Sequence, residues 1–243
     1  MTSATGYLQR ARAARLDRAP LASAFANRYF SGTTCSLFRA ACGPTAQVSK
    51  GLVLDAGSGR GAWRDVIEHN ATRESVDIAP KAGEQVTWIA DLTAMPQVPS
   101  ARYDGIVCHQ VLEHVPHPVA AVNELFRVLK PGGSIAISVP HLSRQHELPH
   151  DYFRFTPQGL RRMLEDAGFE VQSMRHYGGV ACFLHHQFAT ALLGLVSVAG
   201  PIEWLASALN APLSVLCDRF DAWTDRRGLL AVGAVAVARK PAA

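Results

Sequence analysis

The chain has 243 residues, of which 48% are hydrophobic and 18% are charged, and its formal net charge is +4 at pH 7. This composition fits one α/β domain with room for an insertion, and it excludes a largely disordered chain. Four closely spaced arginines near the N-terminus together carry a charge of +4, equal to the net charge of the chain. The remainder of the chain is therefore close to neutral, and the composition does not indicate a nucleic-acid partner. They are Arg10, Arg12, Arg15 and Arg18.

Residues 1–50 are predicted to form a helical N-terminal arm that precedes the first strand. The Arg-rich stretch 7–26 fits an amphipathic helix, although a mitochondrial transit peptide has the same composition. No uninterrupted apolar run of the kind found in a secretory signal is present. The five cysteines are scattered and form no CxxC pair, which favours a reduced cytoplasmic setting.

From Gly51 onward, strand-like and helix-like segments alternate, which predicts a parallel sheet with helices on both faces. The predicted strands are 52–56, 74–78, 86–90, 103–108, 134–139, 170–177 and 229–238. The predicted helices are 62–69, 117–129 and 156–167. Lys130-Pro131-Gly132-Gly133 is predicted to end a helix, and Thr156-Pro157 to begin one with a threonine cap.

An apolar insertion is predicted at about 180–226, before the last strand. Glu203 is the only charged residue between Gln187 and Asp218. A membrane-spanning helix needs about 20 continuous apolar residues, which this stretch barely supplies. It is interpreted as a helical insertion packed on the sheet, or as a cap or membrane-surface element over 187–217, where Trp204 and Trp223 would suit an interface.

The segment 52–63, LVLDAGSGRGAW, is predicted to be a buried strand followed by a glycine turn that opens a helix. Gly57, Gly59 and Gly61 allow a positive φ and let the backbone approach a ligand closely. The acid before them, Asp55, suits a ligand that carries positive charge rather than a pyrophosphate. Taken alone, the glycines also satisfy the GxGxxA pattern of an NAD-binding turn, so that reading stays open.

Two further acids follow the next strands. Asp77, about 20 residues after the glycines, is placed to bind ribose hydroxyls, although it could be only a turn residue before Pro80. Asp91 could accept from an adenine amino group, with Leu92 on the ring, or could cap a local turn. The order Asp55, Asp77, Asp91 predicts a nucleoside site.

Six segments, read in order, resemble class I S-adenosylmethionine-dependent methyltransferases of the type 11, small-molecule group. They are LDAGSGRG, VDIAP, ADLTAMP, YDGIVCHQVLEHVPHP, ELFRVLKPGGSIAISVP and DYFRFTPQGLRRMLEDAGFE, with LLAVGAVAVARK as the last strand. The resemblance covers 51–177 and that strand. It implies a methyltransferase domain over 51–243 with a three-layer, Rossmann-like, seven-stranded sheet, mostly parallel with an antiparallel last strand.

The resemblance also implies the roles of matching positions around S-adenosylmethionine. Asp55 and the Gly57–Gly61 loop would hold the methionine end, and Asp77 the ribose. Ile78, Asp91 and Leu92 would frame the adenine, and Gln110 would approach the methionine end. Glu113-His114 is interpreted as scaffolding at a helix start.

His146–His150 reads HExxH, the pattern of a zinc-protease helix. Pro149 inside the motif is incompatible with a continuous helix, and no third ligand is obvious. No metal site is therefore predicted.

Methyl transfer from a sulfonium requires alignment of the two reactants and exclusion of water, and a hydroxyl acceptor also needs a base. His141 or His150 is predicted to act as that base, with Tyr152 and Arg154 positioning the acceptor. The acceptor is predicted to be a small molecule, a glycan or a lipid-linked molecule. The apolar insertion would fit a lipid-linked glycan or a quinone, and it would fit a hydrophobic lid equally well. An NAD-dependent oxidoreductase and a non-catalytic cofactor-binding protein are the alternatives.

Overall fold

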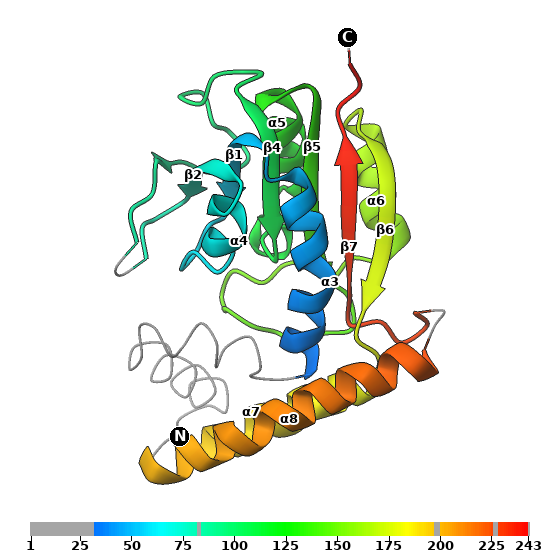
Figure 1. The fold of residues 1–243 in the computed structure, drawn as a ribbon. Coiled ribbons are helices and arrows are strands. Elements are labelled where there is room, and N and C mark those ends of the chain that lie inside the picture. The colour runs from blue at the N-terminus through cyan, green and yellow to red at the C-terminus, as the bar shows by residue number, and fades with distance from the viewer. Residues whose placement is uncertain (1–31, 82–83, 197–199, 226–227, 243) are drawn as a thin grey trace. The chain divides into compact units, whose positions relative to one another are not determined.

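The computed structural model describes residues 32–81, 84–196, 200–225 and 228–242 (Figure 1). Most of the predicted N-terminal arm, including the stretch 7–26, lies outside these residues. The described residues belong to two compact units. One comprises Ala40–His176 with Gly233–Ala243 and contains the sheet. The other comprises Met1–Arg39 with Tyr177–Val232, and each unit is described by itself.

The sheet has seven strands in the order β3-β2-β1-β4-β5-β7-β6. β1 is parallel to β2 and β4, β3 is parallel to β2, and β5 is parallel to β4, whereas β7 runs antiparallel to β5. The predicted fold class, a mostly parallel sheet with an antiparallel last strand, is confirmed. The strands are β1 (Gly51–Ala56), β2 (Ala71–Asp77), β3 (Trp88–Ile89), β4 (Tyr103–His109), β5 (Leu129–Pro140), β6 (Glu170–Tyr177) and β7 (Gly233–Arg239).

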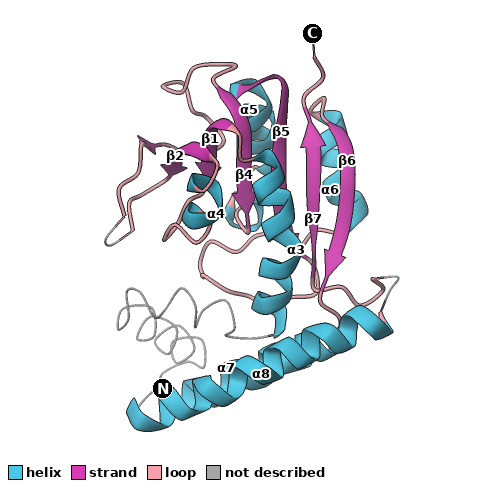
Figure 2. Cartoon of the chain, in the orientation of Figure 1, coloured by secondary structure: helices cyan, strands magenta, loops and turns pink. Residues whose placement is uncertain are grey.

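Within the first unit, helices flank this sheet, and residues 40–48 of α3 lie on the face opposite α5 and α6 (Figure 1). Figure 2 separates the helices from the strands by colour. The described helices are α3 (Gly32–Val48), α4 (Arg64–Glu68), the short 3₁₀ helix η1 (Leu112–His114), α5 (Pro118–Val128), α6 (Pro157–Asp166), α7 (Val180–Val196) and α8 (Gly200–Thr224).

The two faces of the central strands alternate in a regular way. On β4, Ile106 and Cys108 join the main hydrophobic core, to which α5 and α6 contribute Leu125 and Leu160. His109, which follows Cys108 in the chain, faces α3, where the Thr45 hydroxyl lies 2.8 Å from its Nε2. Successive side chains of a strand point to opposite faces, so this alternation buries the sheet on both sides.

The predicted ends of two helices lie close to those of the structure. α5 ends at Val128, one residue before the predicted end, and Leu129 after it is already extended. Thr156 caps α6, since its hydroxyl oxygen accepts a 3.0 Å hydrogen bond from the backbone N–H of Gly159. The boundaries of β5 were predicted wrongly: the strand begins at Leu129, and Pro131-Gly132-Gly133 form an irregularity inside it, with a register shift against β4. Such a bulge inserts extra residues without ending the strand.

The second unit contains the helices α7 and α8, which occupy the predicted insertion at about 180–226. Asp221 of α8 accepts from the backbone N–H groups of Ala181 and Cys182 at the start of α7, at 3.0 and 2.7 Å. These bonds satisfy helix-start donors that have no partner within α7 itself. No described helix combines the length and apolar character needed to cross a membrane.

Candidate functional site

The glycine loop between β1 and α4 has the backbone conformation that its sequence predicts. Gly57, Gly59 and Gly61 all have positive φ, at 68°, 54° and 68°. A Cβ on Gly57 would collide with the side chain of Val111 at 2.5 Å, so the loop packs closely there. A Cβ on Gly59 would meet only the Gly57 carbonyl oxygen at 4.0 Å. The backbone at Gly59 is therefore open to the approach of a ligand.

Asp77 lies at the end of β2 and is fixed against this loop. Its Oδ2 accepts a 2.8 Å hydrogen bond from the backbone N–H of Gly59, and its Oδ1 a weak one, 3.4 Å, from Ala79. A carboxylate can accept about four hydrogen bonds, so it retains capacity for hydroxyl donors. Asp77 thus joins the strand end to the loop, and its predicted ribose contact remains compatible with the geometry.

Asp55 has a partner that the motif did not reveal. Its Oδ2 lies 2.8 Å from both Nε and Nη2 of Arg73 on β2, and both side chains are nearly fully buried. In the β1–β2 register, Val53 faces Arg73 and Asp55 faces Ser75, so Arg73 is the diagonal neighbour of the acid. Burial raises the pKa of Asp55, and the Arg73 guanidinium opposes that rise. The cation beside Asp55 is therefore internal to the protein, and the contact of Asp55 with a methionine group stays a prediction.

The side chains expected to frame an adenine differ in exposure. Ile78 leaves 69% of its surface exposed, whereas Leu92 is buried in the main core. Ile89 of β3, which the sequence analysis did not single out, is 60% exposed. Asp91 accepts from the N–H and the hydroxyl of Thr93, both at 2.8 Å. Asp91 thus makes the local turn named as its alternative role, and the exposed isoleucines offer the apolar surface that a ring would cover.

The last residue of β4, His109, and the residue after it, Gln110, are both bonded to Ser138 of β5. Gln110 has a positive φ of 56°, its N–H donates to the Ser138 carbonyl at 2.9 Å, and its Nε2 donates to the Ser138 hydroxyl at 3.2 Å. Strained non-glycine residues of this kind concentrate at functional sites. The neighbouring His109 is buried between Thr45 and Ser138, at 2.8 and 3.0 Å, and burial lowers its pKa to about 3. His109 is therefore neutral at pH 7.

The predicted catalytic residues follow β5. Two of the three come together: His150 Nδ1 lies 2.9 Å from the Tyr152 hydroxyl, and both side chains are exposed. His141 is half-buried at the end of β5, and none of the contacts given for the described residues joins it to that pair. Arg154 donates from Nη1 and Nη2 to the two carboxylate oxygens of Asp151, at 2.6 and 2.8 Å. These bonds hold together the segment after β5 that carries His150 and Tyr152.

The HExxH segment forms no helix, in agreement with the prediction from Pro149. Residues 141–156 run as an irregular segment whose turn at Leu148–His150 interrupts the motif. Tyr152 and Phe153 donate their backbone N–H groups to the Glu113 carbonyl, which holds this segment against η1.

The described residues fit S-adenosylmethionine by their chemistry. An open glycine backbone lies beside Asp77, a carboxylate with spare acceptor capacity, and exposed apolar side chains follow β2 and form part of β3. These groups suit hydroxyls and an aromatic ring, the two features of a nucleoside.

Comparison with known proteins places the chain in a methyltransferase family. A family model described as a methyltransferase domain matches residues 27–174. A ubiquinone biosynthesis O-methyltransferase of Nitrosospira multiformis is 28% identical over 152 residues, which cover 50% of this chain and 64% of that protein. The chain thus matches less than two thirds of the length of this curated relative.

Two solved structures share the fold. The [4+2]-cyclase SpnF has a TM-score of 0.58 at 19% identity, covering 83% of this chain and 80% of its own. A Burkholderia thailandensis 1,6-didemethyltoxoflavin N1-methyltransferase, solved with its substrate and S-adenosylhomocysteine, has a TM-score of 0.53 at 20% identity, covering 91% and 88%. Since one neighbour is a cyclase, the fold by itself does not specify the reaction.

Proposed function

The chain belongs to the class I S-adenosylmethionine-dependent methyltransferases, and on that basis we propose that it methylates a hydroxyl group of a small molecule with an extended apolar part. The glycan and lipid-linked glycan acceptors considered from the sequence become alternative outcomes of the test below.

The exposed apolar side chains of α7 and α8 support this proposal. Among the side chains of these helices that the structure describes, six large apolar ones are between 42% and 68% exposed, and clusters of such residues mark interaction surfaces. They are Leu184, Phe188, Leu213, Leu216, Phe220 and Trp223. We propose that this surface meets a membrane at which the apolar acceptor resides. The curated relative that acts in ubiquinone biosynthesis has a name consistent with such an acceptor.

S-adenosylmethionine supplies a methyl group on a positively charged sulfur, a good electrophile. The residues of this chain would have to orient the acceptor hydroxyl and take up its proton while the C–O bond forms and the methyl C–S bond breaks, which leaves S-adenosylhomocysteine. We propose that the imidazole of His150 accepts this proton. The Tyr152 hydroxyl, which lies 2.9 Å from His150 Nδ1, would orient the ring. His141 is the second candidate for this role.

The acceptor class is tested by incubating the chain with S-adenosylmethionine labelled in its methyl group and with extracts separated by solubility. We expect the label in the organic phase, which holds small apolar molecules. The labelled methyl group is expected to be joined to its acceptor by an ether bond, which is stable to alkali and insensitive to periodate. Label in polymeric glycan, or in the water-soluble fraction only, would contradict the proposal.

Cofactor binding is tested separately with Asp77→Asn. The amide oxygen of asparagine can still accept from the Gly59 N–H, so the loop is retained, but the charge that strengthens bonds to ribose hydroxyls is lost. We expect the affinity for S-adenosylhomocysteine, measured by calorimetry, to fall about tenfold, the effect of about 1.4 kcal/mol. The control is Asp166→Asn, which changes an exposed acid of α6 paired with Arg162. Equal affinities in the two variants would show that Asp77 does not contact the cofactor. If the wild type bound NADH more tightly than S-adenosylhomocysteine, the result would favour the oxidoreductase.

A further inference from the structure

Glu113 is a fully buried acid whose negative charge is not balanced by a hydrogen bond. The side chain lies on η1 with 0% of its surface exposed, and neither carboxylate oxygen has a hydrogen-bond partner. Burial of an ionised carboxylate without such partners is costly, so a nearby cation is expected. The guanidinium of Arg154 acts on Glu113 through its charge, but its hydrogen bonds go to Asp151 and to backbone carbonyls.

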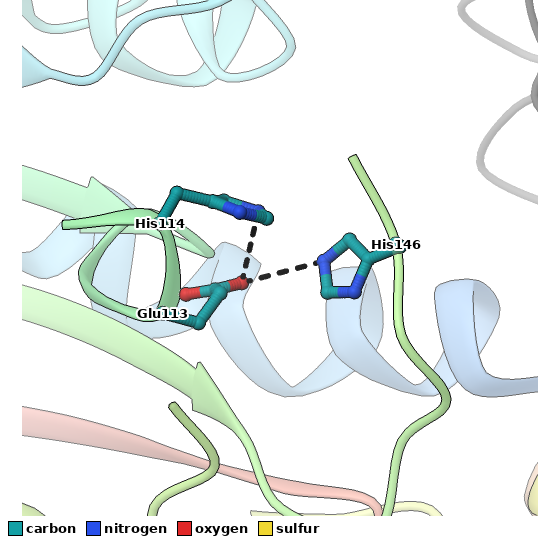
Figure 3. A group of neighbouring side chains, drawn as sticks. All are labelled: Glu113, His114 and His146. Atoms are coloured by element: carbon teal, nitrogen blue, oxygen red, sulfur yellow. Dashed lines mark ion pairs between the residues drawn. The ribbon is translucent and has the colours of Figure 1, made fainter. Parts of the chain in front are cut away.

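Two histidines point toward this carboxylate from different parts of the chain (Figure 3). His114 is its neighbour on η1, and His146 comes from the irregular segment after β5. The Nε2 atoms of His114 and His146 lie 3.8 and 3.7 Å from Glu113 Oε1. These distances are too long for direct hydrogen bonds, which need about 3.2 Å or less.

The other nitrogen of each ring is directed at an oxygen. His114 Nδ1 lies 2.6 Å from the His150 carbonyl oxygen, which can only accept, so this nitrogen carries the proton. His146 Nδ1 lies 3.3 Å from the Arg144 carbonyl and 3.7 Å from Asp151 Oδ2, again both acceptors. Nη2 of Arg154, 3.4 Å away, already donates to these two acceptors. In neutral rings with Nδ1 protonated, both Nε2 atoms present lone pairs toward Glu113.

We propose that Glu113, His114 and His146 bind one divalent transition-metal ion, of which Zn²⁺ is the best fit. The three ligand atoms lie within 4.8 Å of one another. A tetrahedral ion with bonds near 2.1 Å separates its ligands by about 3.4 Å, so a small closure of the side chains completes the site. Donation from Nδ1 to a carbonyl or carboxylate is the usual second interaction of a zinc-bound histidine.

The ligand set also indicates which ions are disfavoured and what the ion could do. Two imidazoles and one carboxylate suit Zn²⁺ and its neighbours in the first transition row, whereas Mg²⁺ and Ca²⁺ prefer oxygen ligands. Three protein ligands leave at least one position for water or a hydroxyl oxygen. The site is defined by the contacts of Glu113 and stands independently of the acceptor proposed above.

The test is calorimetric titration of the untagged chain with ZnCl₂, after chelation and removal of the chelator. We expect one ion per chain, and an affinity at least tenfold weaker in Glu113→Gln and in His146→Ala. The matched control is His117→Ala, which removes an exposed histidine three residues from His114 and is expected to bind as the wild type does. MgCl₂ is expected to give no binding. The absence of zinc binding by the wild type, or unchanged binding in Glu113→Gln, would overturn the proposal.

A second measurement guards against loss of folding and against zinc binding by the five cysteines. With chelator present, Glu113→Gln is expected to melt at or above the wild-type temperature, because it removes a buried charge. With Zn²⁺ present, only the wild type and His117→Ala should gain stability. Co²⁺ loaded into the wild type should show no sulfur-to-metal charge-transfer absorption, and a strong band of that kind would assign the ion to cysteine and overturn the site.

Discussion

At the scale of single residues, the structure connects backbone strain to the expected cofactor site. Gln110 is one of three non-glycine residues with positive φ among the described residues, and it directly follows β4, beside Ser138 of β5. A non-glycine residue in this conformation costs about 1–3 kcal/mol, which the surrounding structure must offset. The position is thus occupied by a side chain where glycine would be less strained.

We expect Gln110→Gly to separate stability from binding. The glycine relieves strain but loses the hydrogen bond to the Ser138 hydroxyl, so unfolding free energy should stay within about 1 kcal/mol of wild type. Affinity for S-adenosylhomocysteine should fall about tenfold. Urea unfolding and calorimetry measure the two quantities. A variant that binds normally would assign Gln110 a purely structural role.

At the scale of elements, strand β2 is anchored by a cluster around Glu74. Its carboxylate accepts from Arg102, from the Tyr103 hydroxyl at 2.7 Å and from the Trp88 indole at 3.1 Å. The cluster links β2 to β3 and β4. The hydrogen bonds from Arg102 are the largest cause that holds the pKa of Glu74 at about 2, below its ordinary value of 4.5.

This shift has a definite sign for stability. The pKa of Glu74 is lower in the folded protein than in the unfolded chain, so the ionised carboxylate stabilises the fold. This stabilisation is complete above pH 4.5 and is lost as the pH falls toward 2. We expect Glu74→Gln to lower the free energy of unfolding by about 2 kcal/mol at pH 7. The difference from wild type should shrink steadily below pH 4.5 in urea titrations. Glu165→Gln, which changes an exposed ion pair on α6, serves as the control. A pH-independent difference would contradict the assignment.

At the scale of the whole molecule, the chain combines a methyltransferase sheet with a separate helical unit whose helices expose apolar side chains. The residues predicted to bind the cofactor all belong to the first unit, and the exposed apolar side chains of α7 and α8 belong to the second. Under our proposals, the first unit binds the methyl donor and the second unit contacts an apolar environment.

The triple variant Phe188→Ser, Leu216→Ser, Trp223→Ser tests this division. We expect the wild type to float with phosphatidylcholine–phosphatidylglycerol vesicles and the variant to remain with the protein-only fraction, because the apolar face has been removed. Leu229→Ser, Leu230→Ser removes exposed apolar surface outside the helices and is the matched control. Both variants should retain binding of S-adenosylhomocysteine. Flotation that is equal in all three proteins, or absent from the wild type, would exclude the membrane contact.

The fold could be predicted largely from the sequence because its signals are local. Glycine at positive φ, the Thr156 cap and the alternation of strands with helices each depend on a few consecutive residues. The irregularity inside β5 was missed, because Pro131-Gly132-Gly133 has the same local appearance as a turn.

What the sequence by itself determined is the fold class and the methyltransferase family, from a glycine loop and strands whose patterns are local. The nucleoside site inferred from Asp55, Asp77 and Asp91 stays a prediction. What only the tertiary structure decided is which side chains become partners. Arg73 beside Asp55 follows from the pairing of β1 with β2, and His146 reaches Glu113 from 33 positions away in the sequence. Such pairs depend on strand register and on the path of an irregular segment, and neither leaves a local pattern in the chain.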